Sequence, residues 1–472
     1  MASRWCELLC PQPKQVASES MHGARLAAQQ LSRGRDACDV EAGKPCQEET
    51  AAAGGGRVAA MASITQQHHS KPTSTFAQSV INMVGMLIGL GQLSTPYALE
   101  NGGWASIFLL VGLGIMCAYT AHIIGKCLDE EPRSKTYQDI GQQAFGSKGR
   151  LIASAFIYLE IFFALVSYTI SLSDTIPLVF AGVRLHLPIP WLRLSTTQLL
   201  TVIAVLVALP SLWLRNLSSI SCLSFAGILM SMVIFVTILC TAAFGSVGLG
   251  KHIPVLRLDK IPTVSGLYMF SYAGHIVFPN IYTAMKDPSS FTKVSVTSFS
   301  MVALLYTALA FVGASLFGPS VNSQVTLSMP PGLLVTKVAL WATVLTPVTK
   351  YALEFAPFAI QLEHHLPATM GPRARIIIRG SIGSAGLLII LALALSVPYF
   401  QYVLSLTGSL ISVAISVIFP CAFYVKIRWG RLSRHVVVLN AAMIAVGFVL
   451  AVVGTASSAK LLVKSIQNGH VA

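Results

Sequence analysis

Hydrophobic residues occur in long runs along most of this chain, and short polar segments separate the runs. An α-helix needs roughly 20 apolar residues to cross a hydrocarbon core of about 30 Å. The alternating pattern of a membrane β-barrel does not appear. The pattern therefore predicts an all-α polytopic membrane protein with eleven transmembrane helices, over residues 76–99, 104–128, 151–177, 195–214, 217–241, 263–285, 294–317, 332–353, 376–397, 399–424 and 435–461.

The composition agrees with this class of protein. Of the 472 residues, 54% are hydrophobic and 11% are charged, whereas soluble domains carry about 25% charged residues. The net charge of +14 does not indicate nucleic-acid binding, because no basic patch interleaved with aromatic residues appears. Most of the excess charge lies in short loops between the predicted spans, where basic residues determine topology.

The N-terminal segment, residues 1–75, has no hydrophobic run and is rich in small and polar residues, so we expect a disordered tail. If this tail is cytosolic, the loops on its side carry fifteen basic residues and the opposite loops carry seven. This excess favours a cytosolic N-terminus and, with eleven spans, a lumenal C-terminus. A membrane domain is then expected over residues 76–465, followed by a short lumenal tail over residues 466–472.

The first predicted span contains residues that interrupt helices. It includes Gly85, Gly89, Gly91 and Pro96, with Asn82 one turn earlier. An interruption in lipid exposes backbone groups at a cost of several kcal/mol each, unless protein or a bound solute satisfies them. Glycines allow the backbone to unwind and to approach a solute closely. The interrupted span is therefore a candidate binding site.

The sixth predicted span has a similar interruption, with Gly274 and Pro279 in its middle. The two spans lie five apart, so they cross the membrane in opposite directions. Paired broken helices in two inverted halves are typical of secondary transporters, where half-helix N-termini bind a substrate carboxylate and unwound carbonyls bind an ammonium group or a coupling ion. An amino acid presents both charges. The alternative is that these residues only serve close helix packing.

Four segments resemble a known family. Residues 88–104 (Ile-Gly-Leu-Gly-Gln-Leu-Ser-Thr-Pro-Tyr-Ala-Leu-Glu-Asn-Gly-Gly-Trp) look like the first-span motif of the amino acid/auxin permease family. Residues 273–288 and 346–353 resemble its sixth-span and eighth-span motifs, and residues 136–146 resemble the loop after its second span. The resemblance is to plant vacuolar-type amino acid transporters and to the vesicular inhibitory amino acid transporter branch.

This resemblance implies a LeuT-type fold with a 5+5 inverted repeat and broken helices 1 and 6. It also implies transport of neutral amino acids that is coupled to protons, in the vacuolar membrane, with the plasma membrane as the alternative. The substrate would be held by backbone at the two interruptions. The expected substrate-binding residues are Gly85, Ile88, Gly89, Leu90, Gly91, Ala273, Gly274 and His275.

Polar side chains within the spans are costly and usually functional, so they are candidates for coupling or gating. Glu160 is either a proton-coupling carboxylate or a carboxyl group bonded to a neighbouring helix. His275 either titrates between an acidic lumen and a neutral cytosol or holds the unwound segment as a neutral donor. Thr343 and Thr346 would ligate sodium beside the first span, or bond the helical turn before them. Asn82 completes this set.

Other polar residues of the spans have structural interpretations. Lys350 and Glu354, spaced four apart, are expected to form an ion pair near the cytosolic end of the eighth span, or to leave the lysine reaching toward the membrane surface. Asp174 is expected at the membrane interface. Tyr158 and Tyr168 are expected to pack against neighbouring helices rather than line a cavity.

No motif for covalent catalysis or nucleotide hydrolysis occurs, so neither an enzyme nor a primary pump is expected. The nine cysteines lack metal-site spacing, and we expect no metal and no cofactor. The leading hypothesis is a secondary active transporter for neutral amino acids, driven by protons and working by alternating access in the lipid bilayer. The alternatives are an amino-acid sensor without net transport and a sodium-coupled symporter.

Overall fold

The computed structural model describes residues 72–131, 134–183, 195–208, 217–245, 252–365, 370–397 and 399–469. The chain divides into Met1–Lys71 and Pro72–Ala472, and the second part is described here. Nearly all of the expected N-terminal tail therefore lies outside the described residues. Within them, every regular element is a helix, and the extended backbone pairs only in an isolated bridge between Ser74 and Met285.

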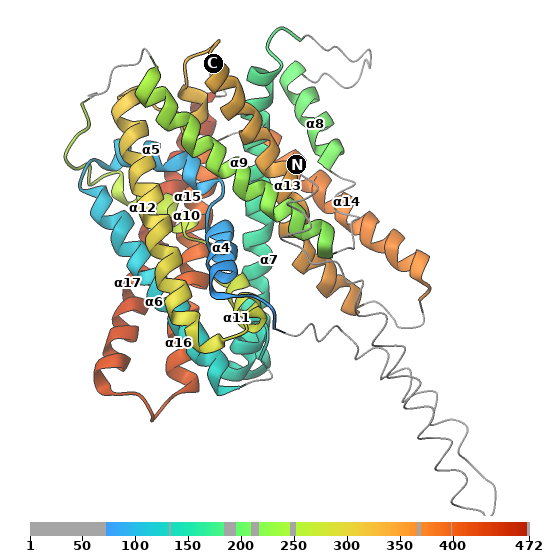
Figure 1. Ribbon diagram of the computed structural model, residues 1–472, viewed down its shortest axis with the longest axis vertical. Helices are drawn as coiled ribbons and strands as arrows, with labels where there is room; N and C mark the ends of the chain where they lie inside the picture. The colour runs from blue at the N-terminus through green and yellow to red at the C-terminus, as the bar shows by residue number, and fades with distance from the viewer. Residues whose placement is uncertain are drawn as a thin grey trace, which may run out of the picture. The chain divides into compact units, whose positions relative to one another are not determined.

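The helices follow the predicted spans in order and position (Figure 1). They are α4 (Phe76–Leu87), α5 (Gly91–Gly102), α6 (Ser106–Glu130), α7 (Tyr137–Val179), α8 (Thr196–Ala208), α9 (Leu217–Phe244), α10 (Ile261–Ser271), α11 (Phe278–Ala284), α12 (Phe291–Phe317), α13 (Leu334–His365), α14 (Pro372–Ser396), α15 (Phe400–Thr407), α16 (Phe419–Ile427) and α17 (Arg434–Gly469). The π-helical segments η7 (Gly408–Ser412) and η8 (Ala414–Ile418) join α15 and α16 into one continuous helix.

Seven helices of the described residues are long and apolar enough to cross a membrane, and there are eight such spans if α4 and α5 are counted as one bent span. The seven are α6, α7, α9 from Phe225, α12, α14, the α15–α16 helix and α17. These helices confirm an all-α polytopic membrane protein. Eleven spans and the inverted repeat stay predictions.

Helix α7 begins before the predicted span because a short helix precedes it. A capping box starts this short helix, since the Thr136 hydroxyl accepts from the amide of Asp139, whose carboxylate accepts from the amide of Thr136. The helix then kinks at Gly146, where φ is +64°, a left-handed conformation that side chains with a Cβ rarely adopt. The long straight part follows this kink, close to the predicted start at residue 151.

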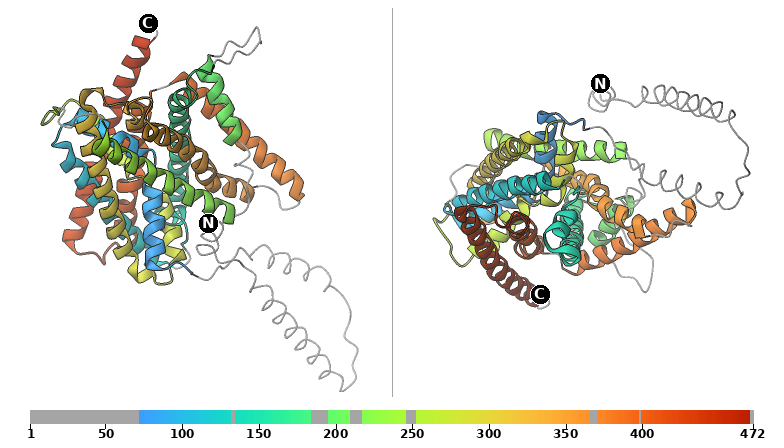
Figure 2. Two further views of the ribbon diagram at one scale, coloured as in Figure 1. Left: turned by 45° about the horizontal axis from the view of Figure 1, so that its top comes forward. Right: turned by 90° about the horizontal axis from the view of Figure 1, so that it is seen from below.

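Helix α10 is largely buried by its neighbours, whereas α4 has an exposed face and α17 lies at the edge of the bundle (Figure 2). Helix α10 packs against α5, α15, η7 and α17, while α12 packs against α4, α5 and α6. Helices α9 and α13 run side by side (Figure 1), and α13 also packs against α7. The central helices are more buried than those at the edge: 67% of the apolar stretch of the α15–α16 helix is buried, against 11% for α17. Helix α17 also continues to Gly469, into the segment expected to be a lumenal tail.

Two half-helices are tied together at the end of the bundle where α4 begins. The amide of Ser74 donates to the carbonyl of Ala284 at 3.0 Å, and the amide of Lys286 donates to the carbonyl of Ser74 at 3.0 Å. Beside them, the Tyr282 hydroxyl donates to the carboxylate of Asp129 at the end of α6. These bonds close the bundle between α4, α11 and α6 at this end.

Candidate functional site

Both predicted interruptions are present. In the first break (residues 88–90), Ile88 is extended with φ −79° and ψ 113°, and the helix axis turns by 59° between α4 and α5. In the second break (residues 272–274), α10 ends at Ser271 and a short 3₁₀ turn from His275 to Val277 leads into α11. Each break leaves backbone donors and acceptors that no α-helix satisfies.

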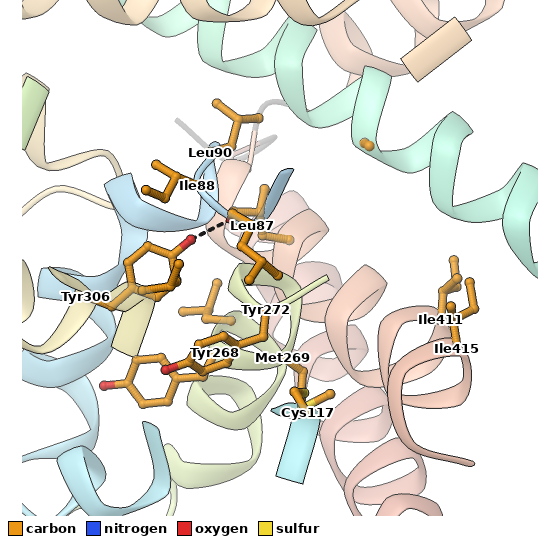
Figure 3. Close-up of a cluster of buried hydrophobic side chains, with 14 of the residues drawn as sticks. Leu87, Ile88, Leu90, Cys117, Tyr268, Met269, Tyr272, Tyr306, Ile411 and Ile415 are labelled. Carbon is orange, nitrogen blue, oxygen red and sulfur yellow. Dashed lines mark hydrogen bonds between the residues drawn. The ribbon is translucent and has the colours of Figure 1, made fainter. Parts of the chain in front are cut away.

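The two breaks are in contact with each other. A Cβ atom added at Gly91 would lie 2.5 Å from the Cα of Ser271, so only glycine allows this approach. The Tyr306 hydroxyl of α12 lies 2.7 Å from the carbonyl oxygen of Leu87 and 3.0 Å from that of Ser271, within donating distance of both. Figure 3 shows Tyr306 pointing at Leu87, with Ile88 and Leu90 beside it. One buried side chain therefore lies within donating distance of backbone acceptors from both broken helices, and its single proton is shared between them.

Lys350 of α13 provides the positive charge at the first break. Its ammonium nitrogen donates to the carbonyl oxygen of Ile88 at 2.8 Å, and the residue is only 6% exposed. Among the described residues it makes no ion pair with Glu354. The lysine turns inward to an unwound carbonyl instead of reaching the surface, and Glu354 lies close enough for the two charges to interact. The sequence shows only the four-residue spacing, whereas the actual partner lies 262 residues away.

A cavity lies between the two breaks, with a volume of about 60 Å³. Since a water needs about 10–15 Å³ by this kind of measure, the space holds a few waters. The cavity is lined by both breaks and by two further helices, through Met86, Leu87, Gly89, Leu90, Gly91, Phe270, Ala273, Gly274, Ile276, Glu160, Ala164, Tyr168, Lys350 and Glu354. We call it the central cavity.

Glu160 of α7 lines the central cavity with one carboxyl oxygen unpartnered. The Ser412 hydroxyl donates to its Oε1 at 2.9 Å, while its buried Oε2 has no hydrogen-bond partner among the described residues. The expected bond to a neighbouring helix is therefore present, and the proton-coupling role of Glu160 stays a prediction. Glu354 lines the same cavity, so two carboxyl groups and the Lys350 ammonium surround one small space.

Six of the residues predicted for substrate binding or coupling line the central cavity, namely Gly89, Leu90, Gly91, Ala273, Gly274 and Glu160. Ile88 contributes its carbonyl to Lys350 instead. Gly85 lies on the packed side of α4, where an added Cβ would come within 2.2 Å of Ile228. Asn82 is exposed on α4 and does not line the cavity.

His275 is fully buried and lies beside the central cavity rather than in its wall. Its Nε2 is 3.2 Å from the carbonyl oxygen of Cys117 and 2.9 Å from the Thr120 hydroxyl, while Nδ1 has no partner among the described residues. Because a carbonyl can only accept, this geometry places the proton on Nε2. The arrangement suits the predicted neutral donor, which ties the second break to α6.

The threonines considered for sodium bond within their own helix. The hydroxyl of Thr343 donates to the carbonyl of Ala339 at 2.9 Å, and that of Thr346 donates to the carbonyl of Ala342 at 2.8 Å. Neither lines the central cavity. Among the described residues, no group of three or more His, Cys, Asp or Glu side chains is placed to hold a metal ion.

Sequence reasoning gave Tyr168 a packing role, and it missed Tyr306 altogether. Tyr168 lines the central cavity, whereas Tyr158 is not among its described lining residues. Tyr168 and Tyr306 both sit in apolar spans that contain other aromatic residues, so their sequence context carries no signal. Only the packing of α7 and α12 against the breaks singles them out.

Comparison with known proteins agrees with the resemblance seen in the motifs. A family model described as "Transmembrane amino acid transporter protein" matches residues 72–460. The chain is 61% identical to Amino acid transporter AVT1H of Arabidopsis thaliana over 84% of this chain and 92% of the relative, and 38% identical to Amino acid transporter AVT1E over 82% and 74%. It is 26% identical to the Vesicular inhibitory amino acid transporter of Rattus norvegicus over 84% and 78%. These relatives are named as transporters and not as enzymes. The chain therefore belongs to the transmembrane amino acid transporter family.

Proposed function

We propose that this protein is a secondary active transporter that carries neutral amino acids across a membrane in exchange or symport with protons. The observation that carries the proposal is the central cavity, where two broken helices, two carboxyl groups and one ammonium group meet. Backbone at broken helices recognises the carboxylate and ammonium that all amino acids share. Substrate binding and the transition between states need no covalent chemistry.

The two ends of an amino acid match different parts of the central cavity. The N-terminus of α5 starts at Gly91, where the first-turn amides and the helix dipole favour the substrate carboxylate. Glu160 and Glu354 favour the substrate ammonium. The present volume of about 60 Å³ requires the half-helices to move apart before a side chain larger than a few waters enters. Recognition by the shared groups supports a range of neutral substrates.

Protons are favoured over sodium as the coupling ion by the position of Lys350. Unwound carbonyls are where a transported sodium ion would bind, but the Ile88 carbonyl already accepts from a fixed ammonium group. The hydroxyls of Thr343 and Thr346 are used within α13. Of the two carboxyl groups in the cavity, we propose Glu160 for taking and releasing the coupling proton, because its buried Oε2 has no partner among the described residues.

Alternating access is supported by the closed end of the bundle. The bonds between Ser74 and Ala284 join the outer ends of two half-helices, so separating α4 from α11 would open the central cavity to that side. We propose that this side faces the cytosol, in an eleven-span LeuT-type fold in the vacuolar membrane; the excess of basic residues in the loops on this side and the family resemblance support the proposal.

The test is uptake into proteoliposomes that contain the full-length protein, with a panel of labelled amino acids. We expect neutral amino acids to accumulate above equilibrium when a pH gradient of one polarity is imposed, and acidic or basic ones to do so far less. Accumulation that needs sodium and ignores pH would instead support the sodium-coupled alternative. Saturable binding without flux under any gradient would overturn transport and favour a sensor.

A further inference from the structure

A second cavity lies at the end of the bundle where α7 ends, away from the tie between Ser74 and Ala284. Its volume is about 600 Å³, within the 300–1,000 Å³ typical of small-molecule sites. It is lined by the last turns of α7, the start of α15, Tyr97 of α5 and the segment around Asn322. We call it the end cavity. It is large enough for an amino acid without rearrangement, which the central cavity is not.

Asp174 is the charged residue among the described residues that line the end cavity. Its carboxylate is held by a chain of side chains, because Gln324 Nε2 donates to Asp174 Oδ2 at 2.8 Å and the Ser171 hydroxyl donates to Gln324 Oε1 at 2.5 Å. Gln324 is fully buried. An aspartate that merely sits at the membrane interface needs no such buried support. The carboxylate is therefore held in a fixed position at the cavity wall.

Amide donors complement this carboxylate elsewhere in the lining. The side-chain oxygen of Asn322 accepts from the backbone amide of Gln324 at 3.2 Å. The side-chain N–H groups of Asn322 make no hydrogen bond among the described residues. Gln401 adds a second side-chain amide to the lining. A fixed carboxylate and neutral amide donors in one cavity match the ammonium and carboxylate of a zwitterion.

We propose that the end cavity is a second amino-acid binding site, at which Asp174 binds the ammonium group before or after the substrate occupies the central cavity. The inference rests on the proposed function for its ligand class. It assigns Asp174 a role in substrate binding, in place of the interfacial role that the sequence suggested. Because the site is distinct from the central cavity, binding there does not require Glu160 or a completed transport cycle.

The test uses a cysteine placed next to the carboxylate. Leu178 lines the end cavity one helical turn from Asp174 and is 49% exposed, so the thiol introduced by Leu178→Cys is accessible. The full-length variant is labelled with methanethiosulfonate reagents that carry either an ammonium or a sulfonate group, and the parent chain supplies the background from native cysteines. The Asp174 carboxylate attracts the ammonium reagent and repels the sulfonate reagent. When Asp174→Asn is added, we therefore expect the labelling rate with the ammonium reagent, divided by that with the sulfonate reagent, to fall roughly tenfold. Asparagine keeps an oxygen that accepts from Gln324, so the local fold is preserved.

Binding is then read as protection of the introduced thiol by a saturating mixture of glycine, alanine, serine and glutamine. We expect these amino acids to slow labelling when Asp174 is present, and the protection to be lost in Asp174→Asn. The exposed loop variant Asp259→Asn removes a charge at the same end and should keep full protection.

Glu160→Gln separates this inference from the proposed function. Protection that persists in Glu160→Gln, even where flux is lost, supports an independent second site. Protection that is absent with Asp174 intact, or unchanged by Asp174→Asn, overturns the inference whatever the flux measurements give.

Discussion

Replacing Lys350 by methionine is expected to reduce amino-acid uptake at least about 100-fold. Methionine has a similar length but no charge, so the Ile88 carbonyl loses its donor at the first break. Two carboxyl groups in the central cavity then lose the positive charge that faces them. Breaking a buried charged interaction by removing one partner costs about 3–5 kcal/mol, which exceeds the roughly 2.8 kcal/mol that a 100-fold loss requires. Initial uptake rates in proteoliposomes measure the effect.

Lys337→Met is the matched control, since it makes the same change at the exposed start of the same helix. We expect its uptake to stay within about twofold of the unsubstituted protein, because exposed lysines contribute little to stability or charge pairing. Equal losses in the two variants would mean that lysines of α13 act through general stability. Normal uptake by Lys350→Met would show that the Ile88 carbonyl needs no cation.

The second large effect is expected from Glu160→Gln, which should uncouple transport from protons. Glutamine cannot bind and release a proton, but its oxygen still accepts from the Ser412 hydroxyl. If one proton moves with each amino acid, one pH unit supplies about 1.4 kcal/mol, which corresponds to tenfold accumulation. We expect this accumulation to disappear, while exchange of labelled for unlabelled amino acid across the membrane continues.

Exchange is the informative control, because it requires binding and alternating access but no net proton movement.

Ser412→Ala is the matched variant. It removes the hydrogen bond to Glu160 and leaves the carboxyl group, so it should retain gradient-driven accumulation. If Glu160→Gln still accumulates substrate with an unchanged dependence on pH, Glu160 is a structural carboxyl and the coupling group lies elsewhere.

The broken helices could be predicted because their signal is local. Gly89 and Gly274 mark the places where the backbone leaves the helix, whereas Gly85 and Pro96 stay inside α4 and α5. The five-span offset relates one apolar run to the other. The backbone contacts expected from Ile88 to Gly91 overlap the break that the structure has at residues 88–90, and Gly89, Leu90 and Gly91 line the central cavity. Most limits of the predicted spans lie within a few residues of the helix ends, but α7 begins earlier, at Tyr137, and α13 and α17 continue to His365 and Gly469.

The side chains that surround the breaks could not be predicted, since their roles depend on distant partners. Lys350 bonds to a carbonyl 262 residues earlier, and Asp174 bonds to Gln324 150 residues later. Sequence spacing reports only neighbours on one helix, so it indicates Glu354 beside Lys350 but not the carbonyl of Ile88. In the same way, Asn82 is polar and close in sequence to the first break, but the turn of α4 places it on the exposed face.

The most direct test is a cryo-electron microscopy map of the full-length protein with a transported neutral amino acid bound. We expect density for the substrate between residues 89–91 and residues 273–274, with its carboxylate at the N-terminus of α5 and its ammonium toward Glu160. The central cavity should be larger than the present 60 Å³. A substrate found only outside this cavity, with the two breaks in contact as they are now, would contradict the assignment of the broken helices as the transport site.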